Sequence, residues 1–157
     1  MSKNTVIVAA VWLALAAGLF YLMDGMLNPN KASTLGEDRT VVLQRGLDGH
    51  YRAQAYINGI RVDVLVDTGA TGVAISPRLA EKLGLQSKTA IRTMTANGET
   101  ISYMTRLDNV KLGGVEAEDV AALIAPGLNG HVLLGMSFLS RMDVRLYQGT
   151  MTIKQVE

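Results

Sequence analysis

The tripeptide Asp67-Thr68-Gly69 brings together residue types that could do chemistry. It ends an alternating apolar run that extends from Ile60 to Val66. A positioned carboxylate can take a proton from a bound water or donate one to a reacting group. A glycine beside it permits unusual backbone angles and a close approach to a ligand. The same residue types are also common in turns, so Asp67 taken alone could simply end a hairpin.

A second apolar strand further along the chain favours the catalytic interpretation. About 65 residues after Asp67, the run 132–134 (Val-Leu-Leu) ends at Gly135. Ala70 follows the tripeptide directly, and a short strand is predicted at 72–75. Without the second strand, the turn interpretation would be preferred.

In these segments the sequence resembles the retroviral-type aspartic proteases, and among them the small, bacterial, membrane-anchored retropepsin-like group. The resemblance covers 52–154, and its best matches are 65–71 and 132–136. It implies an all-β fold with a closed barrel of the acid-protease type, and hydrolysis of peptide bonds as the activity. One departure is Thr71-Gly72, which stands where retroviral enzymes commonly carry acidic residues. Contacts to the ends of a substrate are therefore expected to differ.

The resemblance implies a role for each residue of the matched motifs. Asp67 would be the catalytic aspartate, Thr68 would hydrogen-bond across a dimer axis, and Gly69 would let the backbone approach the substrate closely. The strand that ends at Gly135 would pass behind the active-site loop and support it. The implied loop residues and their support are Thr68, Gly69, Ala70, Leu133, Leu134 and Gly135.

Aspartic proteases work with two aspartates, and this chain contains the tripeptide once. The resemblance therefore implies a homodimer in which each copy contributes one Asp67, and the strand 150–156 could join a dimer sheet. Two carboxylates about 3 Å apart share one proton, and the aspartic-protease pair is the standard example. The ionised member can activate a water while the protonated member donates to the scissile carbonyl, so neither a metal nor a cofactor is expected.

Residues 88–106 are predicted to form a hairpin that turns at Asn97-Gly98. Threonine and serine interleave there with few apolar residues, which places the hairpin outside the core. It could be a solvent-exposed sheet edge or a mobile flap over a cleft. In the order of elements it occupies the place of the flap, so the candidate substrate-binding residues are Thr95, Asn97 and Gly98.

Short strands with regular turn signals make up the domain and argue for a closed barrel or a sandwich. Two alternating runs, 51–57 and 60–66, are joined by Asn58-Gly59, the strongest local hairpin signal. One short helix is expected from Ser76, which can cap it, to Gly84. The remaining expected elements are a hairpin at 107–124, a buried strand at 132–135, a helical turn at 137–141 and a hairpin at 144–154.

The N-terminal segment 5–23 has the properties of a transmembrane helix. It carries no charge, and its 19 residues come close to the roughly 20 that a membrane-spanning helix needs. Residues 14–16 (Ala-Leu-Ala) have the form of a cleavage site, so an export signal is the alternative, although the apolar run is longer than usual for one. By the positive-inside rule, Lys3 and Asp24 predict a domain on the periplasmic side of the inner (cytoplasmic) membrane, while Lys31 and Arg39 after the segment oppose that charge bias. The expected divisions are an anchor at 1–24, a flexible tether at 25–40 and the protease domain at 41–157.

Composition excludes several other classes of function. Of the 15 Lys and Arg residues, Lys3 precedes the apolar segment, which leaves 14 basic against 14 acidic side chains. The globular part is thus formally neutral and lacks the basic excess of a nucleic-acid binder. The chain has no cysteine, which excludes disulfides and thiolate metal sites. His50 and His131 lie far apart in the sequence without His or Cys companions, so no metal site is expected.

Two other functions fit the same sequence. The fold could be a dimerisation or peptide-binding module with weak or no hydrolysis, or a cleaved N-terminus would leave a soluble periplasmic binding protein. The intact Asp-Thr-Gly favours the enzyme, because a pure binder would not need it. The expected partners are a second copy of this chain, a protein or peptide substrate and, through residues 5–23, the membrane.

Overall fold

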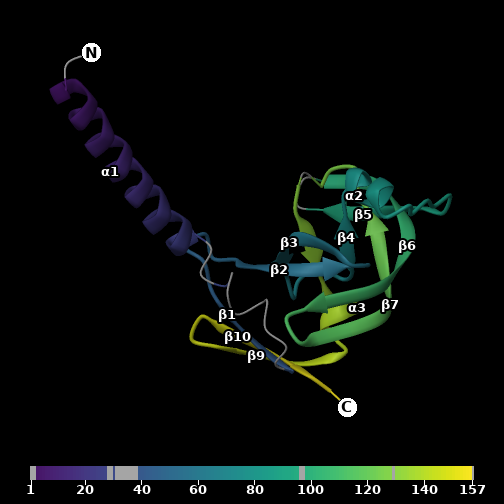
Figure 1. Ribbon diagram of the computed structural model, residues 1–157. Helices are drawn as coiled ribbons and strands as arrows, with labels where there is room; N and C mark the ends of the chain where they lie inside the picture. Colours follow the sequence, from purple (N-terminus) through teal and green to yellow (C-terminus); the bar gives the residue numbers. More distant parts are fainter. Residues whose placement is uncertain (1–2, 28–29, 31–38, 96–97, 129, 157) are drawn as a thin grey trace.

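The computed structural model describes residues 3–27, 30, 39–95, 98–128 and 130–156. Figure 1 shows a long N-terminal helix that extends away from a domain built mainly of strands. In chain order the elements are α1 (Lys3–Leu27), β1 (Thr40–Gln44), β2 (Tyr51–Ile57), β3 (Ile60–Val66), β4 (Val73–Ile75), α2 (Pro77–Lys82), β5 (Ala90–Thr95), β6 (Gly98–Leu112), β7 (Val115–Ile124), β8 (Val132–Leu134), α3 (Met136–Leu139), β9 (Met142–Tyr147) and β10 (Thr150–Gln155).

The hairpin of β2 and β3 forms as the alternation predicted. Every second residue of β2 from Ala53 to Ile57 is buried, while the residues between them remain partly or fully exposed. Asn58 and Gly59 have φ angles of 45° and 81°, the left-handed values that a tight two-residue hairpin turn requires. Asn and Gly are the residues that accept such angles at least cost, so the turn follows from local sequence.

Six strands close into a barrel in the order β2-β3-β8-β4-β7-β6, because β6 pairs again with β2. Asn58 reinforces this closure: its backbone N–H donates to the carbonyl oxygen of Asn109 at 2.9 Å, and its side-chain Oδ1 accepts from the Asn109 N–H at 3.0 Å. The expected all-β closed barrel is therefore confirmed. Strand β5 pairs with β6 outside the closed ring.

Strand β6 is longer than the sequence indicated. Separate hairpins were expected at 88–106 and 107–124, but 98–112 forms one continuous strand. It pairs with β5 near its start and with β7 from Tyr103 to Leu112. No glycine or proline interrupts the chain between Gly98 and Leu112, so nothing local ends the strand.

A second sheet of three strands, in the order β1-β10-β9, lies below the barrel in Figure 1. Strand β10 is central: Ile153 lies opposite Val41 of β1 on one side and Val144 of β9 on the other. Both edges of β10 therefore bond within the same chain, and the hypothesis that strand 150–156 joins a dimer sheet stays a prediction. Strand β1, which the sequence did not predict, occupies one of those edges.

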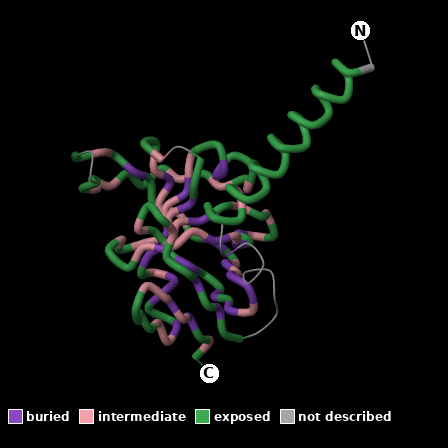
Figure 2. The backbone as a smooth tube through the Cα atoms, turned by 90° about the vertical axis from the view of Figure 1, so that its left-hand side faces the viewer, coloured by how far each residue is buried: buried purple, intermediate pink, exposed green. Residues whose placement is uncertain are grey.

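The two short helices lie where the sequence predicted helical turns. Ser76 caps α2, and its Oγ accepts a hydrogen bond from the Leu79 N–H at 3.3 Å. One-turn helix α3 buries Phe138 and Leu139 in a core cluster that also contains Met151 of the second sheet. Figure 2 shows buried backbone running through the strands of the domain, and an exposed α1.

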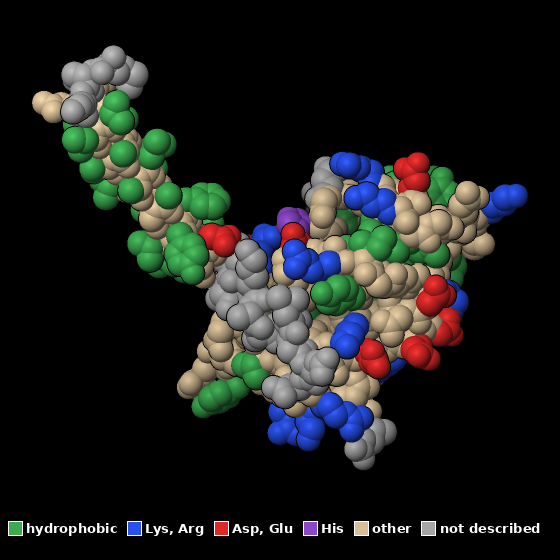
Figure 3. All heavy atoms as spheres, viewed as in Figure 1, with side chains coloured by type: hydrophobic (Ala, Val, Ile, Leu, Met, Phe, Trp, Pro, Cys, Tyr) green, Lys and Arg blue, Asp and Glu red, His purple; other side chains and the backbone are tan. Residues whose placement is uncertain are grey.

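Helix α1 is long and apolar enough between Asn4 and Leu27 to cross a membrane, by length and composition. Such a helix near an N-terminus fits either an anchor or a signal sequence. Hydrophobic side chains cover its visible surface (Figure 3), and it continues past the predicted boundary at residue 24. Of the predicted tether, residues 28–29 and 31–38 lie outside the described residues. Asn30 differs from the prediction of a flexible tether, because its side chain is buried and only 2% of the residue is exposed.

Candidate active site

The Asp67-Thr68-Gly69 loop follows β3 and is held by its own backbone and by β8. The Asp67 N–H donates to the carbonyl oxygen of Leu134 at 3.1 Å, which continues the β3–β8 pairing into the loop. The Gly69 N–H donates to Asp67 Oδ1 at 2.8 Å, and this bond orients the carboxylate. Asp67 is half-buried, while Thr68 and Gly69 are exposed. The carboxylate is thus fixed in direction and remains accessible.

Gly135 lies so close to the back of this loop that a side chain would not fit. A Cβ placed on Gly135 would lie 2.6 Å from the carbonyl oxygen of Ala70 and 2.4 Å from that of Gly72. The next residue, Met136, donates its N–H to the same Ala70 oxygen at 2.8 Å. The β8 end therefore packs directly against the loop backbone, with Leu133 and Leu134 paired in parallel to β3.

Ser137 is a supporting residue that the sequence analysis missed. Its Oγ accepts a hydrogen bond from the Val73 N–H at 2.9 Å and donates one to the carbonyl oxygen of Ala121 at 2.7 Å. The hydroxyl thereby joins α3 to β4, just after the Asp67 loop, and to β7. Only its position two residues after Gly135 could have drawn attention to it.

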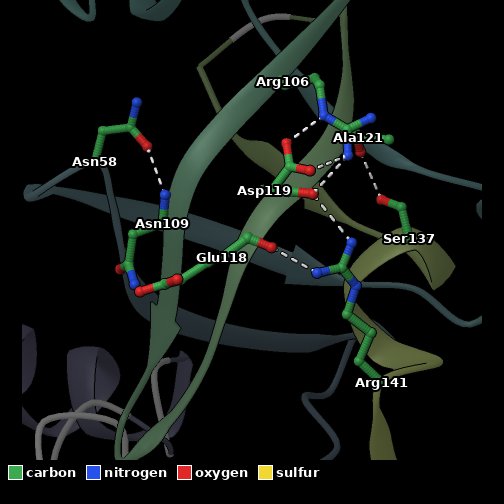
Figure 4. Close-up of polar contacts among 8 residues, drawn as sticks. All are labelled: Asn58, Arg106, Asn109, Glu118, Asp119, Ala121, Ser137 and Arg141. Atoms are coloured by element: carbon green, nitrogen blue, oxygen red, sulfur yellow. Dashed lines mark hydrogen bonds and ion pairs between the residues drawn. The ribbon is translucent and has the colours of Figure 1, made fainter.

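Arg141 fixes the other end of α3 to β7, as Figure 4 shows. Its guanidinium donates to the carbonyl oxygens of Glu118 and Asp119, the latter at 3.0 Å. Asp119 has a φ of 49°, and its carboxylate pairs with Arg106. The hydrogen bond from Arg106 lowers the pKa of Asp119 below its ordinary value, so the pair persists into acid. Helix α3 is thus attached to β7 at both ends.

A hollow of about 470 Å³ lies beside Asp67 and Thr68. The loop 45–50 lines one part of it and the β9–β10 turn lines another, and the Arg45 N–H donates to the carbonyl oxygen of Gly149 at 2.9 Å between them. His50 also lines this hollow, so the fold brings an imidazole, expected to be an ordinary loop residue, to the edge of the candidate site.

Asp48 holds the loop 45–50 in shape. Its Oδ1 accepts from the His50 N–H at 3.1 Å, and its Oδ2 pairs with Arg52 at 2.8 Å. The hydrogen bond from the His50 amide, followed by the Arg52 side chain, lowers the pKa of Asp48 below its ordinary value. The carboxylate therefore stays ionised, and the loop stays braced, further into acid than for a free aspartate.

The structure does not bring the predicted flap residues to this hollow: neither Thr95 nor Gly98 lines it. Asn97 lies outside the described residues. Thr95 Oγ1 donates to the carbonyl oxygen of Gly98 at 2.8 Å, so these two residues close the hairpin end. The hairpin projects sideways from the upper part of the domain, to the right in Figure 1 and to the left in Figure 2, far from the sheet of β1, β10 and β9.

No group of three or more His, Asp or Glu side chains within the described parts of the chain could hold a metal ion.

Comparisons with a family model and with solved structures all find aspartic or retroviral proteases. The family model described as "gag-polyprotein putative aspartyl protease" matches residues 53–141. A crystal structure of a retropepsin-like aspartic protease from Rickettsia conorii is similar with a TM-score of 0.65 and 29% identity, over 74% of this chain and 90% of that one. The EIAV protease in complex with an inhibitor has a TM-score of 0.51 at 20% identity, over 60% of this chain and 88% of that one, a likeness of fold.

Two curated relatives are uncharacterized proteins. One, in the cobV 5′ region of a Sinorhizobium species, is 33% identical over 78% of this chain and 55% of its own length. The other, from Rickettsia prowazekii, is 35% identical over 64% of this chain and 45% of its own length. The chain thus spans about half the length of these relatives. Since the family model covers more than half of a chain that forms this barrel, the protein belongs to the retropepsin-like aspartic protease family.

Proposed function

We propose that the protein is a membrane-anchored aspartic endopeptidase that works as a homodimer. The observation that carries the proposal is the Asp67 loop: a single accessible carboxylate, oriented by the Gly69 N–H and backed by Gly135. Preorganised geometry of this kind is what proton transfer to a bound substrate requires. Membership of the aspartic protease family supports the reaction type.

The proposed mechanism uses one Asp67 from each copy. Two adjacent carboxylates cannot both ionise cheaply, so the pair holds one proton between them. The ionised member takes a proton from a water placed between the two carboxylates, and that water attacks the peptide carbonyl. The protonated member donates to the carbonyl oxygen, which gives a tetrahedral intermediate with two hydroxyl groups. The carboxyl group that took the proton of the water then gives it to the amide nitrogen while the other carboxylate takes a proton from one hydroxyl, so the C–N bond breaks, the amine and the carboxylic acid leave, and the pair again holds one proton. The exposed Thr68 lies next to Asp67 and is the candidate for contact with the same residue of the second copy.

Residues 5–23, within α1, are proposed to anchor the protein in the inner (cytoplasmic) membrane, with the domain at 41–157 on the periplasmic side. The length and composition of α1 support a membrane-spanning helix, and the side of the domain is proposed from Lys3 before the helix and Asp24 near its end. Confinement of both copies to one surface would raise their local concentration and favour pairing. Extended segments of nearby proteins are the proposed substrates, with Thr95, Asn97 and Gly98 as proposed contacts from the β5–β6 hairpin.

The test compares the full-length Asp67→Asn variant with wild type on an unfolded protein substrate. We expect no hydrolysis by the variant at any pH, with unchanged circular dichroism and unchanged self-association. Asp63→Asn is the matched control, since Asp63 is an exposed carboxylate on the same strand outside the loop, and this variant should retain activity. Hydrolysis at the wild-type rate by purified Asp67→Asn would refute the mechanism.

Mixing the two proteins tests the shared site. A tenfold excess of Asp67→Asn should draw wild-type copies into mixed pairs with one carboxylate, which lowers wild-type activity to about one tenth. Unchanged activity in the mixture would show that each copy works alone. Peptide binding without hydrolysis by wild type would instead identify a binding module.

A further inference from the structure

A groove of about 820 Å³ lies outside the Asp67 loop, between β3, α2 and the segment that leads into β8. Three exposed cations line it: Arg61 from β3, and Arg78 and Lys82 from α2. His131 lines it as well, and Asp63 is the single acidic residue in the lining. The walls between them are apolar, with Val62, Pro77, Leu79, Pro126, Leu128 and Val132.

The three cations form no ion pair with any described residue. Other exposed cations of the domain do pair: Arg92 with Glu99, and Arg145 with Asp143. Because the domain is formally neutral as a whole, the positive charge of this groove must be matched by acids elsewhere. Figure 3 shows Lys and Arg side chains over α2 at the top of the domain with an acidic side chain near them, and several Asp and Glu side chains, with a few basic ones, at the right.

Asn30 ties this side of the domain to the end of α1. Its Nδ2 donates to the carbonyl oxygens of Gln44 and Arg52 at 2.9 Å each, and its Oδ1 accepts from the Gln44 N–H at 2.6 Å. Three hydrogen bonds to backbone make it a fixed point on the domain. Asn30 follows Leu27, the last residue of α1, by three positions, so the two lie within about 11 Å of each other.

Asn30 lies beside the basic groove. Asn30 shares a smaller hollow of about 180 Å³ with Asp63 and His131, and both of those residues also line the groove. The groove therefore opens on the side of the domain where the chain arrives from α1. If α1 spans a membrane, the anions closest to the groove are the phosphates of the lipid head groups.

We propose that this groove is a docking surface for anionic phospholipid head groups, which sets the orientation of the domain on the bilayer. The proposal rests on the membrane anchor of the proposed function. Each Lys or Arg held near an anionic surface strengthens attachment about fivefold, and the three cations together account for an effect on the order of 100-fold in the ratio of docked to undocked domain. Docking of this kind weakens with salt.

The experiment uses the full chain in vesicles and takes advantage of its lack of cysteine. A spin label is attached to a single cysteine introduced by Glu81→Cys on exposed α2, or by Gln148→Cys in the β9–β10 turn as the reference position. A paramagnetic reagent carried on lipid head groups reports how close each label lies to the bilayer. We expect the label on α2 to approach phosphatidylcholine–phosphatidylglycerol vesicles but not phosphatidylcholine vesicles, with the approach lost at high salt.

Charge removal identifies the residues responsible. Arg61→Gln, Arg78→Gln and Lys82→Gln combined should lower the docked-to-undocked ratio on the order of 100-fold. The matched control combines Lys88→Gln, Lys111→Gln and Lys154→Gln, which removes the same charge elsewhere and should leave docking unchanged. Equal label depth in both kinds of vesicle, or no effect of the groove substitutions, would overturn the proposal.

Two further outcomes distinguish lipid docking from a failure of the membrane anchor and from binding of an acidic protein segment. Failure of the chain to float with phosphatidylcholine vesicles at high salt would refute the anchor itself, whereas a chain that floats without docking on anionic vesicles overturns the groove proposal alone. Binding of a fluorescent oligoglutamate that needs the three cations, without lipid docking, would assign the groove to an acidic protein segment and overturn the lipid proposal.

Discussion

The Asp67 loop and the β5–β6 hairpin are held in opposite ways. The loop is bonded on both sides by backbone groups of β8 and α3, and Gly135 leaves no space behind it. Strand β5 pairs with β6 alone, none of its residues is fully buried, and Met94 is 82% exposed. The loop thus has backbone partners in two other elements, whereas β5 is held by β6 alone.

This difference suits the two tasks that the proposed function assigns to these regions. Proton transfer depends on a fixed carboxylate, so the loop gains from contacts that allow no alternative position. A hairpin that admits and releases a substrate must open, and weak attachment to the core makes opening cheap. The comparison would lose its meaning if changes in the two regions affected activity and stability in the same proportion.

Gly135→Ala should have the largest effect. The new methyl group would meet the Ala70 and Gly72 carbonyl oxygens well inside contact distance, so the Asp67 loop must shift. We expect a loss of about 2–3 kcal/mol in the free energy of unfolding and a fall in turnover of about 100-fold. Denaturant unfolding and peptide turnover measure the two. In the control Gly127→Ala, the methyl group enters open space and both values should stay unchanged. Wild-type turnover in Gly135→Ala would show that the loop is not tightly held.

Gly98→Pro should separate activity from stability in the hairpin. Gly98 has a φ of 105°, which proline cannot adopt because its ring fixes φ near −65°. We expect turnover to fall about tenfold, as a barrier change near 1.4 kcal/mol would produce. The melting temperature should change by no more than about 4 °C. Gly98→Asn, which tolerates left-handed angles, is the control and should keep most turnover. Equal losses of folding and turnover would assign the hairpin to the scaffold.

The smallest effects are expected at two serines, the half-buried Ser137 beside the loop and the buried Ser102 in the hairpin. Ser137→Ala leaves the Val73 N–H without its acceptor beside the loop, and Ser102→Ala removes a hydroxyl that pairs with Thr93 at 2.8 Å in the hairpin. Each should cost about 1–2 kcal/mol of unfolding free energy. Only Ser137→Ala should also lower turnover, by a few-fold. Equal turnover in both variants, measured under conditions where both are folded, would remove Ser137 from the support of the loop.

Local signals in the sequence predicted the first hairpin and the short helix correctly, whereas the boundary expected between the hairpins at 106 and 107 was wrong. Asn58-Gly59 and the alternation around it specify a turn and two strands by themselves, because both signals act over a few residues. Ser76 specifies the start of α2 for the same reason. The pairing of the Asp67 loop with the run ending at Gly135 was predicted through family resemblance, since nothing local links residues so far apart.

What the sequence determined by itself, then, was the alternation, the turns, the apolar N-terminal helix and the identity of the candidate acid. Only the tertiary structure decided that β10 lies between β1 and β9, that Ser137 joins three elements, and that Asn30 fixes the start of the domain beside a basic groove. Each of these depends on strand pairing and burial between segments distant in the chain. Such contacts form only when the whole barrel closes, so no short stretch of residues specifies them.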